Sequence, residues 1–190
     1  EQDQNLRTPV VSPDRSHKGI LLIDKDQVTV VPVDICFPVL HGKHGEDGTI
    51  QGLFQLAGIP FVGCNMISSA NCMDKEMTHT ILEANGIKMA KWVIVNGEKM
   101  NDFENFAKDA EEKLGYPMFV KPANAGSSVG VGKAHNREEL KSACETALKE
   151  DYKAVVEECI EMQEVETAVL GNGDPKAAGV VGELVPVVEF

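Results

Sequence analysis

The stretch that most constrains how this chain can fold runs from Met118 to Lys133. It opens with an apolar run that has the length and bulk of a buried strand and ends on Lys121, which Pro122 fixes in place. The strand therefore directs a cation to its own end. Small residues and hydroxyls follow, in the order Asn-Ala-Gly-Ser-Ser-Val-Gly, and they allow backbone N–H groups to approach a ligand closely. This combination is typical of a loop that binds phosphate.

The spacing of the glycines in this loop leaves a second interpretation open. Neither G-x-x-x-x-G-K-S/T nor G-x-G-x-x-G can be drawn through Gly126, Gly130 and Gly132. A β-hairpin with a Gly/Ser turn and a solvated lysine accounts for the same residues about as well. Spacing by itself does not choose between a phosphate site and an ordinary hairpin.

The charge of the chain limits the kinds of ligand that it can bind. Its 190 residues are enough for one ordinary domain or two small ones, and they carry a formal net charge of −12. Sequence-independent binding to nucleic acid or to an anionic membrane needs a field of the opposite sign, so both are disfavoured as partners. Any anionic ligand must then be held by a few local lysines.

The cysteines and the N-terminal residues indicate a reducing, cytoplasmic setting. The five cysteines form no C-x-x-C pair and lie in apolar or helical contexts, which favours reduced core residues over disulfides or zinc ligands. No apolar run reaches membrane-spanning length, and residues 1–5 resemble neither a signal nor a transit peptide. We therefore expect a cytoplasmic protein with no membrane partner.

The first third of the chain predicts a hairpin followed by a β-α-β unit. Residues 1–18 are polar and lack apolar periodicity, so we expect loop or disorder there, and residues 19–33 predict two short strands. The hairpin side chains expected to face inward are Ile20, Leu22, Val28, Val30 and Val31. The elements predicted after the hairpin are a strand at 34–40, a Gly-rich loop at 41–48, a helix through 50–57 and a strand at 58–63. This order suggests a parallel sheet.

The rest of the chain predicts helices that alternate with strands. Asp74 can cap a helix that Gly86 closes, and Asn136 with Glu139 has capping-box spacing ahead of another helical face. Between these two helices, the apolar residues of 103–114 recur at helical spacing. The predicted strands are 91–95, 118–120, 154–160, 165–170 and one that starts near residue 177.

Lys75 stands in the first turn of the helix that Asp74 caps. A cation at this positive end of a helix is unfavourable by about 0.3–1 kcal/mol. An anion bound at the same end would offset that cost. A solvated surface lysine is the alternative interpretation.

Six short motifs, spread from Val39 to Glu158, are more specific than these patterns. They are Val39-Leu40-His41-Gly42, Gly45-Glu46-Asp47-Gly48-Thr49-Ile50-Gln51-Gly52, Ser69-Ala70-x-x-Met73-Asp74-Lys75, Val120-Lys121-Pro122, Gly126-Ser127-Ser128-Val129-Gly130 and Glu157-Glu158. Together and in this order they resemble the D-alanine–D-alanine ligase family, which includes the related D-alanine–D-serine ligases of vancomycin resistance. The resemblance covers the chain from about Val33 onward.

The resemblance implies an α/β protein with the ATP-grasp fold, divided into three parts. Residues 1–72 would be a remnant of an N-terminal, parallel-sheet substrate-binding domain. Residues 73–162 would form the central ATP-grasp subdomain. Residues 163–190 would supply the first strands of the C-terminal subdomain.

The resemblance also implies roles for residues near the phosphates and the substrate. Lys75 and Lys121 would contact the nucleotide phosphates. Ser127 and Ser128 would belong to the loop that closes over them, and His41 would lie near the substrate carboxylate. His41 and Ser127 are therefore the catalytic candidates.

A second group of residues would bind the nucleoside of ATP. Glu157 would accept a hydrogen bond from the exocyclic amine of adenine, for which a carboxylate is a suitable acceptor. Backbone groups from Glu158 to Ile160 would border the ring. Glu164 would take the ribose hydroxyls, and a solvated carboxylate at a strand end is its alternative interpretation.

The activity implied by the resemblance is the ATP-dependent joining of two D-alanines for peptidoglycan synthesis. We expect ATP and Mg²⁺ as cofactors, with the magnesium ligands beyond Phe190 and none within this chain. The family's Gly-rich N-terminal segment is not found before Val33, so we expect a fragment. Because the magnesium ligands are expected beyond Phe190, we expect this fragment to be inactive by itself. The full-length protein is expected to be a homodimer.

Two other functions stay open on the sequence. The second amino acid could be D-serine, as in the vancomycin-resistance ligases. The chain could also be a non-catalytic module that binds a nucleotide or a partner.

Overall fold

The largest sheet in the described part of the chain has four antiparallel strands in the order β4-β7-β5-β6. The computed structural model describes residues 7–25 and 27–185. The strands of this sheet are β4 (Trp92–Asn96), β7 (Lys153–Glu158), β5 (Met118–Pro122) and β6 (Gly132–Ala134). The register places Val120 opposite Val156 and Lys121 opposite Val155. Because successive side chains of a strand alternate between faces, Val120 and Lys121 lie on opposite faces of the sheet.

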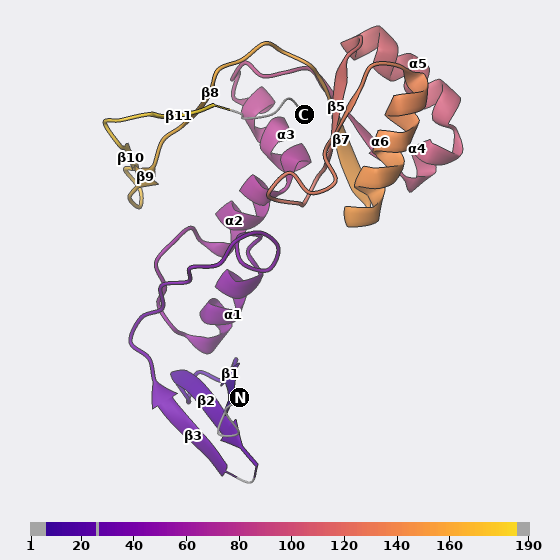
Figure 1. Ribbon diagram of the computed structural model, residues 1–190. Helices are drawn as coiled ribbons and strands as arrows, with labels where there is room; N and C mark the ends of the chain where they lie inside the picture. Colours follow the sequence, from indigo (N-terminus) through magenta and orange to yellow (C-terminus); the bar gives the residue numbers. More distant parts are fainter. Residues whose placement is uncertain (1–6, 26, 186–190) are drawn as a thin grey trace.

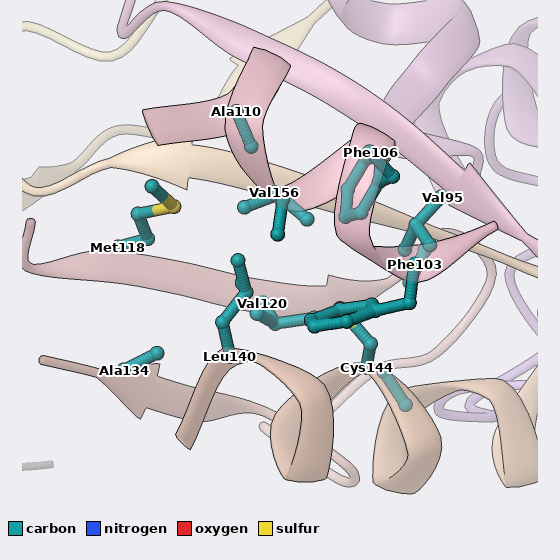
Figure 2. Close-up of a cluster of buried hydrophobic side chains, with 13 residues drawn as sticks. Val95, Phe103, Phe106, Ala110, Met118, Val120, Ala134, Leu140, Cys144 and Val156 are labelled. Carbon is teal, nitrogen blue, oxygen red and sulfur yellow. The ribbon is translucent and has the colours of Figure 1, made fainter. Parts of the chain in front are cut away.

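One face of this sheet is covered by helices and forms the core. Helices α5 (Phe103–Leu114) and α6 (Arg137–Glu150) pack on it, and the short α4 (Gly97–Asn101) connects β4 to α5. Figure 2 shows the strand side chains of Val120 and Val156 together with Phe106 and Leu140 from the helices. The buried cluster consists of Val95, Phe103, Phe106, Ala107, Ala110, Met118, Val120, Ala134, Leu140, Cys144, Ala147, Ala154 and Val156.

The N-terminal part of the chain has its own small sheet and three helices. Strands β1 (Thr8–Val11), β2 (Gly19–Asp24) and β3 (Gln27–Pro32) pair antiparallel in that order. They are followed by α1 (Thr49–Ala57), α2 (Met66–Met73) and α3 (Lys75–Ala84). In Figure 1 the small sheet lies at one end of an elongated molecule, and α2 and α3 lead from it to the four-stranded sheet.

Residues 164–184 form two short ribbons. Strand β8 (Glu164–Glu166) pairs with β11 (Gly182–Leu184), and β9 (Val169–Leu170) pairs with β10 (Lys176–Ala177). All four strands are exposed. The predicted strand at 165–170 is therefore wrong as a single element, because residues 167 and 168 interrupt it.

Several sequence predictions are confirmed. The hairpin at 19–33 is present, and the helix predicted at 103–114 forms α5. The Asp74 side chain accepts hydrogen bonds from Glu76 and Met77 at the start of α3. The Asn136 side chain accepts one from the Glu139 N–H at the start of α6. Short polar side chains therefore fix both helix starts, as the capping patterns indicated.

Three predictions in the N-terminal part need correction. Residues 8–11 are not loop, because they form β1 against β2, while residues 1–6 lie outside the described residues. The inward-facing valines of the hairpin are also wrong, since every residue of β3 is exposed. The strands predicted at 34–40 and 58–63 do not form a parallel sheet, because parallel pairing in the described part of the chain is limited to one bridge between Cys36 and Phe61.

The core prediction can be tested at Leu140, which is fully buried between α6 and the sheet. Leu140→Ala should lower the free energy of unfolding by about 2–5 kcal/mol, because it removes buried methyl groups and leaves a cavity. Urea denaturation followed by circular dichroism measures this. Leu56→Ala makes the same change in α1 where the side chain is 61% exposed, and should cost less than about 0.5 kcal/mol. Equal losses in the two variants would contradict the placement of the core.

Candidate functional site

The second face of the four-stranded sheet carries charged residues in place of a helix-packed core. Alternation along β7 puts Lys153, Val155 and Glu157 on this face, and β5 adds Lys121. The register places Trp92 of β4 directly opposite Glu157. The strand pattern therefore gathers two lysines and a glutamate on the surface that α3 approaches.

Glu157 is the centre of this group. Its side chain is only 9% exposed, and its Oε2 lies 2.5 Å from the Nζ of Lys121. Its Oε1 lies 2.7 Å from Nε2 of His79 on α3. Burial would raise the pKa of Glu157, but the hydrogen bond and charge of Lys121, with a contribution from His79, lower it below the ordinary value. The carboxylate is thus held ionised, as an acceptor only.

Lys75 joins this group from the start of α3. Its backbone N–H donates to the Ala123 carbonyl, and its Nζ donates to the Ala125 carbonyl at 2.7 Å. Burial, followed by the nearby charge of Lys121, lowers the pKa of Lys75. The alternative of a solvated surface lysine is therefore wrong. Two repelling cations share one site, and an anion placed there would relieve both.

Lys153 ties α3 to the sheet. Its side chain is 8% exposed, and its Nζ lies 2.8 Å from Asp74 Oδ2 and 2.5 Å from Glu76 Oε2. Burial would lower the pKa of Lys153, but its bonds to these two carboxylates raise it well above the ordinary value. Asn124 adds a bond from its Nδ2 to Asp74 Oδ2. The loop after β5 and the first turn of α3 are therefore held together.

Sequence reasoning missed His79 and Lys153. A signal for His79 was present, since it follows Lys75 by four residues and so projects from the same helical face. A signal for Lys153 was its even spacing from Glu157 along one strand. The predicted strand began at Ala154, one residue too late to include it.

The serine-bearing loop lies beside the predicted substrate histidine. Ser127 and Ser128 have φ angles of 52° and 56°, a left-handed conformation that costs a non-glycine residue about 1–3 kcal/mol. Ser127 lines a cavity of about 290 Å³ together with His41, Lys43 and Glu150. The structure thus brings His41 and Ser127 to one cavity, although they are far apart in sequence.

The remaining predicted residues lie apart from the group around Glu157. Glu158 projects to the other face, where its Oε1 accepts a hydrogen bond from the Lys91 N–H at 2.7 Å. Ile160 is 49% exposed just beyond β7. Glu164 begins the exposed strand β8, opposite Leu184. The expected contacts of Glu158 and Ile160 with adenine, and of Glu164 with the ribose, stay predictions.

The charges in this group define the chemistry that it can perform. Lys75 and Lys121 can bind a polyanion, and the ionised Glu157 can accept a hydrogen bond from a neutral donor such as an amine. A ligand that carries a polyanion at one end and a hydrogen-bond donor at the other would match both.

Solved structures with a similar fold define the class of protein. The chain superposes on VanG D-Ala:D-Ser ligase from Enterococcus faecalis with a TM-score of 0.85 and 45% identity, over 96% of this chain and 51% of that chain. It superposes on the D-alanine-D-alanine ligase from Coxiella burnetii with a TM-score of 0.83 and 34% identity, over 94% and 50%. The fold is therefore α/β, of the ATP-grasp class.

Sequence comparison narrows this class to one family. The description "D-ala D-ala ligase N-terminus" matches residues 1–64, and "D-ala D-ala ligase C-terminus" matches residues 81–190. The D-alanine--D-alanine ligase of Clostridium acetobutylicum is 53% identical over 83% of this chain and 46% of its own length. That of Thermoanaerobacter sp. (strain X514) is 46% identical over 95% and 50%. The chain belongs to the D-alanine–D-alanine ligase family and spans about half the length of these curated relatives.

One boundary of the resemblance is corrected by these matches. The N-terminal family match begins at residue 1, so the resemblance is not limited to the chain from Val33 onward. The division at residues 72 and 73 falls in the interval 65–80 between the two family matches, and it stays a prediction.

The lowered pKa of Glu157 predicts that the stability of the folded chain depends on pH. Because the folded-state pKa of Glu157 is lowered, its stabilisation is fully present above the unfolded-state value near 4.3 and is lost as pH falls through the folded-state value. The free energy of unfolding of Glu157→Gln should therefore differ most from wild type near neutral pH. Urea denaturation at several pH values checks this.

The control for this experiment is Glu112→Gln, which changes an exposed glutamate. Its difference from wild type should be small at every pH. A Glu157→Gln difference that stays constant from pH 7 to about pH 3 would contradict the ion pair.

Proposed function

We propose that this chain supplies the ATP-binding part of an ATP-dependent ligase that joins two D-alanines into D-alanyl-D-alanine. The observation that carries the proposal is the meeting of Lys75 and Lys121, from different elements, beside the ionised Glu157. In a chain with a net charge of −12, two adjacent cations at a loop of small residues are suited to a triphosphate. Membership of the ligase family supports the same assignment.

The proposed roles follow the two ends of the nucleotide. Lys75 and Lys121 bind the phosphates, and the loop of Ser127 and Ser128 closes over them. Glu157 accepts a hydrogen bond from the exocyclic amine of adenine. The backbone from Glu158 to Ile160 borders the ring, and Glu164 binds the ribose hydroxyls.

The proposed reaction has two steps. The carboxylate of the first D-alanine takes the γ-phosphoryl group of ATP and becomes an acyl phosphate. The amine of the second D-alanine then displaces phosphate and forms the peptide bond. His41 lies near the substrate carboxylate, and its shared cavity with Ser127 supports this placement. A closing loop would protect the acyl phosphate from water.

The proposal assigns no magnesium ligand among the described residues. Within residues 7–25 and 27–185, no group of three or more His, Cys, Asp or Glu residues could hold a metal ion. We therefore assign no described residue to the Mg²⁺ that this family is expected to use.

The setting that we propose for the reaction is the cytoplasm. All five cysteines are free, which suits a reducing compartment. None of the helices in the described residues has both the length and the apolar character needed to cross a bilayer. The role in peptidoglycan synthesis and the homodimer belong to the same proposal.

ATP binding by the 190-residue chain tests the proposal. Isothermal titration with ATP and Mg²⁺ should show binding, and Lys121→Ala should weaken it about 10- to 100-fold, because a charge-assisted contact is removed. Lys88→Ala changes an exposed lysine outside the site and should bind like wild type. A wild-type chain that gives no heat with ATP would favour a module with no nucleotide function.

The second amino acid is decided by a separate assay. D-serine is the alternative to D-alanine, and the similarity to VanG D-Ala:D-Ser ligase supports testing it. We expect the product of the intact gene to release phosphate faster with D-alanine alone than with D-alanine and D-serine together. The reverse order would assign the protein to the D-alanine–D-serine ligases.

A further inference from the structure

His79 connects the helix of Lys75 to the carboxylate of Glu157. It follows Lys75 by four residues on α3, so both side chains leave the same face of the helix. Lys75 reaches the Ala125 carbonyl, and the Nε2 of His79 lies 2.7 Å from Glu157 Oε1. One helical face thus carries Lys75, which the proposed function assigns to the phosphates, and His79, which bonds the carboxylate assigned to the base.

The imidazole of His79 is held in a fixed orientation. Its side chain is 17% exposed, and its ring centroid lies 5.4 Å from that of Trp92, the residue opposite Glu157 in the sheet. Because a carboxylate oxygen only accepts, the proton of the bond to Glu157 is on Nε2. The Nδ1 atom is buried and has no hydrogen-bond partner among the described residues.

A histidine that served only for packing would not explain this geometry. A leucine could fill the same space without burying an unpartnered nitrogen, which is unfavourable. Leucine could not form the hydrogen bond to Glu157, because that bond needs a donor such as the His79 imidazole. His79 and Lys121 hold one carboxylate oxygen each, so the group cannot rotate and keeps both oxygens as acceptors.

We propose that His79 is a positioning residue that sets base selection at this site, by holding Glu157 as a fixed acceptor for an exocyclic amine. A base that presents a carbonyl at the same place, as guanine does, would meet an acceptor opposite an acceptor and be rejected. The inference rests on the proposed function, because it assumes that a nucleotide occupies the site.

The experiment compares three ligands on the 190-residue chain by isothermal titration: ATP, GTP and inorganic tripolyphosphate, each with Mg²⁺. His79→Leu should weaken ATP binding about 10-fold and reduce the preference for ATP over GTP, while the affinity for tripolyphosphate stays as in wild type. His79→Gln should restore most of the ATP affinity, because its amide can donate to Glu157. His135→Ala, a change of an exposed histidine, should match wild type throughout.

Two results would overturn the inference alone. One is unchanged ATP affinity in His79→Leu, and the other is an equal loss for ATP and tripolyphosphate, which indicates a general effect on α3. A wild-type chain that binds neither ATP nor tripolyphosphate would contradict the proposed function as well. If His79→Leu does not fold, ¹⁵N NMR of the wild-type imidazole provides the test: protonation at Nε2 supports the inference, and a proton on Nδ1 alone overturns it.

Discussion

The buried carboxylate of Glu157 is the interaction on which the rest of this site depends. An ionised group that is 9% exposed is stable only if its charge is compensated, and here a strand and a helix each supply a partner. Lys121 comes from β5 and His79 from α3. The position of α3 against the sheet is therefore coupled to the ionisation of one side chain. Lys75 is carried by the same helix as His79, so its position is tied to this carboxylate as well.

The two faces of the four-stranded sheet explain how stability and function are separated. One face is buried under α5 and α6, so its residues are selected for packing. The other face carries charges that would be costly to bury without partners, and the α3 residues supply them. The period of two in β5 and β7 makes this separation possible, since neighbouring residues of one strand point to opposite faces. A strand can thus stabilise the core and present a lysine at the same time.

Patterns within single elements could be read from the sequence, and partners between elements could not. The caps at Asp74 and Asn136 and the helix at 103–114 follow from local spacing, and the structure contains them. The strand β1 was missed because its pairing with β2 depends on a neighbour rather than on its own four residues. His79 and Lys153 were missed for the same reason, since their roles exist only once α3 lies against β7. The convergence of Lys75 and Lys121 was expected only through the family resemblance, since the two residues are 46 positions apart in the sequence.

The most direct test of the shared site is the chemical reactivity of Lys121, whose side chain is 31% exposed. The chain would be treated with an amine-acylating reagent with and without ATP, and modification of each lysine measured by mass spectrometry. If Lys121 contacts the phosphates, ATP should reduce its modification, while Lys88, which is exposed and distant in sequence, should react equally in both samples. Equal modification of Lys121 with and without saturating ATP would contradict the account.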